Sequence, residues 1–125
     1  MSLSIDIRQM NDVCILDVTG RVTLGDGAST LRDMLRTMPE KGHKKILLNL
    51  AETTLIDSSG LGVLVSGFAS VANQGGRLKL LNLNKRVKDL LLITKLYTVF
   101  EVFDDEKLAI RSFREARVET PVSAG

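Results

Sequence analysis

Apolar and polar residues alternate along this chain with two different periods, which predict its strands and its helices. Period-two alternation and short apolar runs predict strands at residues 3–9, 13–19, 44–50, 77–83 and 99–103. Apolar residues at helical spacing predict helices at residues 28–38, 58–73, 87–94 and 104–116. The order β-β-α-β-α-β-α-β-α predicts one α/β domain with a mostly parallel sheet.

The second predicted strand is expected at the centre of this sheet. Its apolar residues fall on both faces, with Cys14 and Leu16 on one and Val13 and Ile15 on the other. This pattern is typical of a strand that is covered on both sides. The strand at residues 3–9 alternates and is expected at an edge, and residues 20–27, which hold three glycines, are expected to form a loop.

The predicted domain covers residues 1–117. Residues 118–125 contain Pro, Ser and Gly and have little to bury, so they are expected to form a flexible C-terminal tail. The apolar residues 90–93 surround their helix more fully than one buried face requires. Leu92 and Ile93 are therefore either exposed or covered by the last helix or the chain end.

The helix at residues 58–73 has an unusual surface, because no charged residue occurs between Ser58 and Gly76. A helix at the surface of a protein normally carries charge on its outer side. One predicted stripe is apolar and suits the core: Leu61, Leu64, Val65, Phe68 and Ala72. A second stripe is small and uncharged: Ser58, Gly62, Ser66, Ala69 and Asn73. Either another element of the fold covers this small-residue stripe, or it is a docking surface for a partner.

The candidate chemistry lies where a strand gives way to this helix, in the run Asp57-Ser58-Ser59-Gly60-Leu61-Gly62. The first N–H groups of a helix lack intrahelical partners, and the helix dipole favours negative charge there. A serine at this position can cap the helix, carry a phosphate or act as a nucleophile. The function of the protein depends on which of these three applies.

The composition of the chain argues against several classes of protein. The formal net charge is only +2 and no dense block of Lys or Arg occurs, so nucleic-acid binding is not expected. Cys14 is the only cysteine, which predicts a buried structural thiol without a disulfide or a multi-cysteine metal site. No apolar run approaches the roughly 18 residues of a membrane span, and charges come too early for a signal peptide. We expect a cytoplasmic protein that does not associate with membranes.

The run from Leu55 to Leu64, Leu-Ile-Asp-Ser-Ser-Gly-Leu-Gly-Val-Leu, resembles the signature of the STAS-domain anti-sigma factor antagonists of the bacterial sporulation and general-stress type. The similarity extends over residues 1 to about 117 and includes Asn49-Leu50 before the motif and Gly75-Gly76 after it. The resemblance implies a small mixed sheet flanked by helices, in agreement with the predicted order of elements.

The resemblance also implies a partner-switching protein rather than an enzyme. In that family, the serine after the motif aspartate, here Ser58, is phosphorylated by an anti-sigma factor that is itself a serine kinase of the ATPase fold. The unphosphorylated form binds the anti-sigma factor and frees the sigma factor, and the phosphorylated form is released. A metal-dependent serine phosphatase then removes the phosphate. Ser59 is the second choice for the acceptor, because the sequence alone does not separate two adjacent hydroxyls.

One segment departs from the family pattern. Members of the sporulation type carry Gly-Glu-Leu-Asp followed by Thr-Ala after the second strand, whereas this chain has Arg21 and Thr23 at the acidic positions. Asp26 is a candidate replacement for the missing acid. In the family this loop contributes to partner contact, so a reversed charge predicts a partner with a different complementary surface. The expected partner-binding residues are Thr23, Leu24, Asp26, Asp57, Ser59, Gly60, Leu61, Gly62 and Ser66.

Three rival interpretations remain open. A serine hydrolase would need a base near Ser58, but His43 is the only histidine and is expected at the opposite end of the domain. A phosphoryl-accepting Asp57 would need further carboxylates at neighbouring strand ends to hold Mg²⁺, and Gly20-Arg21-Val22-Thr23 supplies none. A STAS subunit of a signalling scaffold or of a transport assembly would keep the fold and change the task. No Gly-rich phosphate cradle with a lysine is present, so no cofactor is expected.

Overall fold

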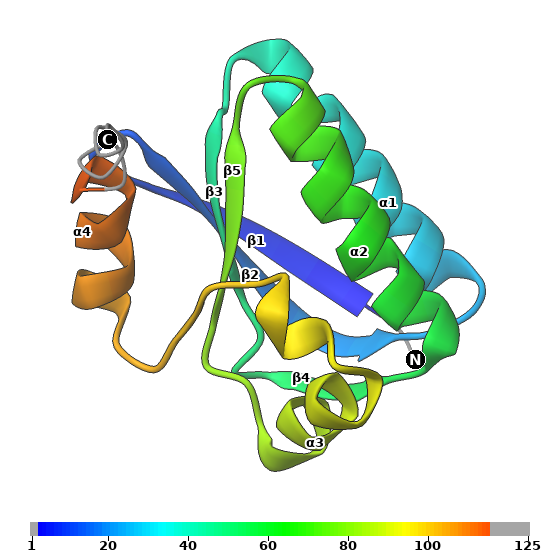
Figure 1. Ribbon diagram of the computed structural model, residues 1–125. Helices are drawn as coiled ribbons and strands as arrows, with labels where there is room; N and C mark the ends of the chain where they lie inside the picture. The colour runs from blue at the N-terminus through cyan, green and yellow to red at the C-terminus, as the bar shows by residue number, and fades with distance from the viewer. Residues whose placement is uncertain (1–2, 116–125) are drawn as a thin grey trace.

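The computed structural model describes residues 3–115, which form a six-stranded sheet with helices on both faces (Figure 1). In chain order the elements are β1 (Leu3–Met10), β2 (Val13–Val22), α1 (Asp26–Thr37), the 3-10 turn η1 (Pro39–Lys41), β3 (Lys45–Asn49), β4 (Thr53–Ile56), α2 (Ser58–Asn73), β5 (Arg77–Leu81), α3 (Lys85–Thr94), the 3-10 turn η2 (Leu96–Thr98), β6 (Val102–Phe103) and α4 (Glu106–Glu115). The predicted α/β class and mostly parallel sheet are confirmed. The predicted C-terminal tail at 118–125 and Ala116 lie outside the described residues.

The sheet is mixed, and its order is β1-β2-β3-β5-β6. Only the β1–β2 pair is antiparallel, and the pairs β2–β3, β3–β5 and β5–β6 are parallel. β1 lies at the edge, as predicted. β4 lies off this path. It pairs in parallel with residues Gly20 to Val22 of β2, and the register shifts between Gly20 and Arg21. The first half of β2 pairs with β3, so β2 supports two different neighbours along its length.

Two apolar clusters hold the helices on the two faces. On one face, Cys14, Leu16 and Val18 of β2 pack with residues of α1, α2 and α3. On the other face, Val13 and Ile15 pack with Ala109 and Phe113 of α4, which lies alone on its side of the sheet (Figure 1). The prediction that both faces of this strand are covered is therefore confirmed.

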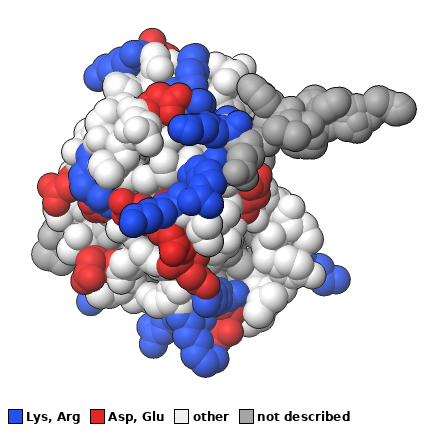
Figure 2. Space-filling model, turned by 90° about the vertical axis from the view of Figure 1, so that its left-hand side faces the viewer, with Lys and Arg blue, Asp and Glu red and all other residues white. Residues whose placement is uncertain are grey.

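Polar contacts attach α4 to the sheet. The guanidinium of Arg8 on β1 donates to Asp17 of β2 at 2.6 Å and to Glu106 of α4 at 2.8 Å. Asn49 also donates to Asp17, at 2.8 Å. Burial alone would raise the pKa of Asp17, but the hydrogen bonds from Arg8 and Asn49 lower it below its ordinary value. The face that carries α4 is densely charged, with cations and acids intermingled (Figure 2).

Three local predictions were wrong. The order of elements lacks β4, which is a separate four-residue strand between β3 and α2. The predicted loop at 20–27 is shorter, because β2 continues to Val22 and α1 begins at Asp26. The predicted strand at 99–103 is reduced to Val102–Phe103.

Candidate functional site

Asp57 joins the end of β4 to the start of α2. It is the N-cap residue, and its backbone is extended before the helix begins at Ser58. Its Oδ1 accepts a hydrogen bond from the Gly60 N–H at 2.9 Å, and its Oδ2 accepts one from the Leu24 N–H at 3.0 Å. The hydrogen bonds from Leu24 and Gly60 lower the pKa of the Asp57 carboxyl below its ordinary value. The motif aspartate therefore caps its own helix and also anchors the loop that follows β2.

Gly60 allows α2 to start directly against the end of β2. A Cβ added at this position would lie 2.9 Å from Cγ2 of Ile56 and 3.0 Å from the carbonyl carbon of Val22, and closer still to the Val22 oxygen. The Asp57 N–H also approaches the Val22 oxygen, at 3.4 Å. The missing side chain at Gly60 thus brings the helix start and the loop after β2 together.

The two hydroxyls of the motif have different surroundings. Ser58 is exposed, whereas Ser59 is half-buried and lines a hollow of about 280 Å³ between the first turns of α1 and α2. The residues that line this hollow are Leu24, Gly25, Ala28, Ser29, Arg32, Ser59, Gly62, Val63 and Ser66. Four of the predicted partner-binding residues therefore meet in one place.

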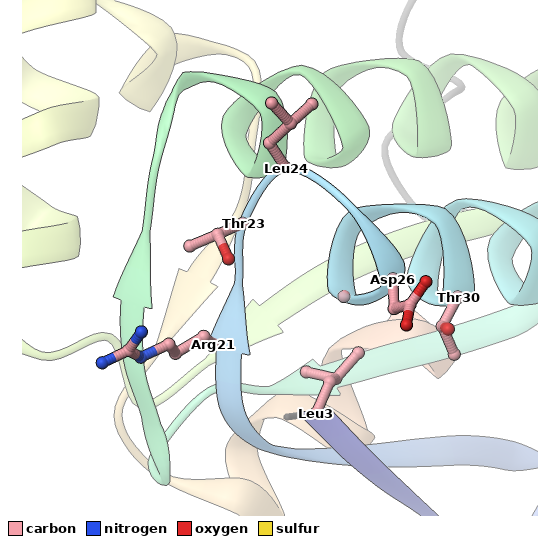
Figure 3. Close-up of a pocket in the computed structure, with 7 residues that line it drawn as sticks. Leu3, Arg21, Thr23, Leu24, Asp26 and Thr30 are labelled. Atoms are coloured by element: carbon pink, nitrogen blue, oxygen red, sulfur yellow. The ribbon is translucent and has the colours of Figure 1, made fainter. Parts of the chain in front are cut away.

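A second hollow, of about 360 Å³, lies on the other side of the loop after β2 (Figure 3). Thr23, Leu24 and Asp26 line it, together with Arg21. Figure 3 shows the Arg21 side chain directed away from Asp26. Leu24 stands between the two hollows and is 80% exposed, which makes it the most prominent apolar side chain of this surface.

Two of the predicted partner-binding residues are not accessible to a partner. Gly60 and Leu61 are buried. Sequence reasoning missed Ser29 and Arg32 of α1, which line the hollow beside Ser59. The sequence indicates only that these two residues lie on the outer side of α1. That position suggests a site only when α1 is known to pack against α2.

The small-residue stripe of α2 is exposed along its whole length. Ser58, Gly62, Ser66, Ala69 and Asn73 are all exposed, so within residues 3–115 no other element covers this stripe. Four residues of the predicted apolar stripe face the core: Leu61 and Leu64 are buried, and Val65 and Phe68 are partly buried against it. Gly60, Val63, Gly67 and Val71 are buried on this side of α2 as well. Ala72, predicted in the core, is exposed. Ala72 is exposed because α2 is rotated so that Gly67 packs directly against Leu35 of α1. A Cβ added at Gly67 would collide with the leucine side chain.

His43 lies far from Ser58 and cannot serve as its base. The N–H of His43 donates to the carbonyl of Met38, and Lys44 reaches the carbonyl of Gln74, just beyond the last residue of α2. Since α2 has 16 residues, His43 lies roughly 24 Å from Ser58 along the helix. The hydrolase interpretation loses its only candidate base.

The interpretation of Asp57 as the phosphoryl acceptor lacks the acidic cluster that it requires. In residues 3–115, no three side chains of the types His, Cys, Asp and Glu are grouped so that they could hold a metal ion. Both oxygens of Asp57 are also engaged in backbone hydrogen bonds. Across the same residues, no helix has the length and apolar character needed to cross a membrane.

Comparison with known proteins places this architecture in a family. The sequence profile of the STAS domain matches residues 4–109. The chain is 32% identical over 102 residues to the anti-sigma-B factor antagonist of Bacillus subtilis, and this alignment covers 82% of this chain and 92% of that protein.

Solved structures have the same fold. A crystal structure of a Thermotoga maritima protein assigned as an anti-sigma factor antagonist has a TM-score of 0.80 and 26% identity, and covers 88% of this chain and 94% of that one. The phosphorylated form of SpoIIAA, a Bacillus cell fate determinant, has a TM-score of 0.67 over 86% of this chain and 98% of its own. At 17% identity this second likeness concerns the fold alone. By its sequence and its fold, this chain belongs to the STAS-domain family of anti-sigma factor antagonists.

Proposed function

We propose that this protein is a phosphorylation-controlled partner switch. In its unphosphorylated form it binds an anti-sigma factor with serine kinase activity, and the kinase transfers the γ-phosphoryl group of ATP to the Ser58 hydroxyl. The phosphorylated form leaves the kinase, and a metal-dependent serine phosphatase restores the free hydroxyl. One observation carries the proposal: Ser58 is exposed, and it is the first residue of an exposed, charge-free stripe on α2.

The surroundings of Ser58 suit a phosphate acceptor rather than a nucleophile. Both oxygens of the neighbouring Asp57 accept backbone hydrogen bonds, and His43 is at the far end of α2. The base that takes the hydroxyl proton must therefore come from the kinase. The start of a helix also stabilises negative charge, so the domain can carry the phosphate without unfolding.

The same phosphate would oppose docking on the stripe. It adds about −1.5 to −2 charges at neutral pH beside the Asp57 carboxylate. A partner that packs against Gly62 and Ser66 would have to remove water from this charge without a cation on α2 to pair with it. Release on phosphorylation follows from this cost.

Burial favours Ser58 over Ser59 as the acceptor. Ser58 is exposed, whereas Ser59 is half-buried in the hollow between α1 and α2. A kinase can reach the first hydroxyl without moving α1. SpoIIAA, which shares the fold, has been solved in both an unphosphorylated and a phosphorylated form.

The test uses the purified chain, ATP and the serine-kinase anti-sigma factors encoded in the same genome. We expect one of them to add a single phosphate, which peptide mass spectrometry places on Ser58. Ser58→Ala should abolish the modification and Ser59→Ala should retain it. In calorimetric titrations without ATP, Ser58→Ala should bind this kinase as tightly as the wild type, and Ser58→Asp should bind at least about tenfold more weakly. Equal affinity of the two Ser58 variants would refute the switch.

A further inference from the structure

Two places on the surface leave large apolar side chains in solvent. On α3, Leu92 and Ile93 are 57% and 79% exposed, so the part of α4 up to Glu115 does not cover them. On the edge strand β1, Ile7 is 53% exposed and Met10 43%. β1 differs from α3 because the edge of a sheet also offers backbone groups for hydrogen bonds to another strand.

The outer edge of β1 is open within residues 3–115. β1 is the first strand in the order of the sheet, and it pairs with β2 on its inner side. It runs for 8 residues without Pro or Lys, and its register with β2 is continuous. Proline, lysine and bulges are the usual means by which an edge strand is protected against further pairing. β1 therefore presents a regular edge on which a further strand can pair.

The backbone groups of alternate residues of β1 point outward. The carbonyl of Val18, which lies opposite Ile5, accepts a hydrogen bond from the Thr53 hydroxyl at 2.9 Å, on the β4 side of β2. The N–H of Gly20, opposite Leu3, likewise donates at 3.0 Å to the residue that precedes β4. These pairs are therefore the ones without β1–β2 hydrogen bonds, and the alternation of an antiparallel pair extends this pattern along the strand. The outward N–H and C=O groups belong to Leu3, Ile5, Ile7 and Gln9.

The charges of β1 favour a second copy of the chain as the added strand. β1 holds one acid, Asp6, and one cation, Arg8, and their side chains lie on the same face of the sheet. When two β1 strands pair antiparallel about Ile7, Asp6 of each copy lies opposite Arg8 of the other. Pairing about Asp6 or about Arg8 would instead oppose like charges, and pairing about Ile5 would place Ser4 opposite Asp6.

Arg8 can face the second copy and keep its own contacts. Its Nε and Nη2 donate to Asp17, and its Nη2 and Nη1 donate to Glu106. A guanidinium has one N–H on Nε and a pair on each terminal nitrogen, so these hydrogen bonds leave one N–H of Nη1 for Asp6 of the second copy. Because Asp17 and Glu106 already share this cation, the charges select the register more than they strengthen the contact.

We propose that this protein forms a symmetric dimer in which the β1 strands of two copies pair antiparallel about Ile7. The hydrogen-bonded pairs join Ile7 to Ile7 of the second copy, and Ile5 of each copy to Gln9 of the other. The exposed Ile7 side chains then cover each other, with Ile5 diagonally beside them. One strand pairing is a small interface, so we expect a weak dimer with a Kd on the order of 100 μM. The proposal does not depend on Ser58, because all of its residues lie in β1.

The test measures sedimentation equilibrium of the full chain between about 10 μM and 1 mM. We expect a monomer–dimer equilibrium, and Asp6→Arg should weaken it at least about tenfold because it brings cations of the two copies together. Asp89→Arg is the matched control, since it makes the same change of charge at an exposed residue of α3, and it should associate like the wild type. Unchanged thermal unfolding will verify that both variants are folded.

Two further measurements test the register. Chains with Asp6→Arg and chains with Arg8→Asp should associate with each other more tightly than either does with itself, because the mixed pair has opposite charges at both positions. Arg8→Asp also removes contacts within the fold, so amide exchange of the wild type supplies a measurement without substitution. The amides of Ile5 and Ile7 should exchange more slowly as the protein concentration rises, whereas those of Asp6 and Arg8, which face β2, should not change.

Three results would overturn the proposal. The chain could remain monomeric up to about 1 mM. A dimer could form that Asp6→Arg leaves intact, which would place the contact on another surface. Finally, Ile5 and Ile7 could be protected from exchange to the same degree at every concentration, which would show that another part of the same chain occupies the edge.

Discussion

Two glycines of α2, Gly60 and Gly62, should respond to alanine with opposite changes in stability. At Gly60, an added Cβ would lie within 3.0 Å of Ile56 Cγ2 and of the Val22 backbone. At Gly62, the same atom would meet nothing within 4 Å. Both residues lie in the same helix, two positions apart. Each substitution therefore removes a glycine that disfavours the helix, and this gain is common to the two variants.

The magnitudes follow from two opposing contributions. Alanine in place of glycine inside a helix stabilises it by about 1 kcal/mol. Overpacking a tight contact costs roughly 1–3 kcal/mol, and the cost at Gly60 should be at the upper end because a backbone oxygen cannot rotate away. We therefore expect Gly60→Ala to lower the free energy of unfolding by about 2 kcal/mol and Gly62→Ala to raise it by up to about 1 kcal/mol. At roughly 4 °C per kcal/mol, the two midpoints should differ by about 12 °C.

The assay is thermal and urea unfolding of both variants followed by far-ultraviolet circular dichroism. Urea gives the free energy of unfolding, and the thermal midpoint gives an independent order of stability. A Gly60→Ala variant as stable as Gly62→Ala would refute the close approach of α2 to β2. A Gly62→Ala variant less stable than the wild type would show that the outer side of α2 is not open.

Three further changes test the supports of the fold. Asp57→Asn should destabilise the protein most at neutral pH and progressively less as the pH falls below about 3.9, because a carboxyl with a lowered pKa in the folded state contributes stability that is complete above its unfolded pKa and is lost as the pH falls through its folded pKa; a series of urea midpoints from neutral to acidic pH measures this. Arg8→Ala should cost about 1–2 kcal/mol by leaving Asp17 without its guanidinium, and the pKa of Asp17, followed by carbon-13 NMR, should rise. Leu64→Ala should cost about 2–5 kcal/mol because Leu64 is fully buried, whereas Leu108→Ala on the exposed side of α4 should cost well under 1 kcal/mol in the same urea experiment.

The arrangement of the core was predictable wherever the apolar pattern has one clear side. Cys14 and Leu16 alternate with Val13 and Ile15, and the structure buries both sets as the pattern indicated. Ala72 was misplaced because α2 has no charge to mark its outer side. Periodicity alone then does not fix how the helix is rotated, and packing of Gly67 on Leu35 decides it.

The missing strand and the extended one have a common cause. β4 contains Thr53 and Thr54 and only four residues, which is too short for a period-two pattern to stand out. β4 forms because β2 continues beyond its pairing with β3 and offers a free edge there. Gly20, whose φ is +105°, lies at the register shift of this second pairing. The grouping of Leu24 with Ser59 and Ser66 depends on this geometry, whereas the motif that contains Ser58 was visible in the sequence itself.

β2 pairs with β3 along its first half and with β4 near its end, and this second pairing supports the proposed docking surface around Leu24 and α2. The segment that carries Leu24 follows the end of β2, and the first turn of α2 follows β4, which pairs with that end. Asp57 links the two segments by accepting a hydrogen bond from the Leu24 N–H. Their relative position is therefore set by this strand pairing and by the hydrogen bond between Asp57 and the Leu24 N–H. In the proposed switch, a phosphate on Ser58 would change the charge of a surface whose two parts are anchored on the same strand.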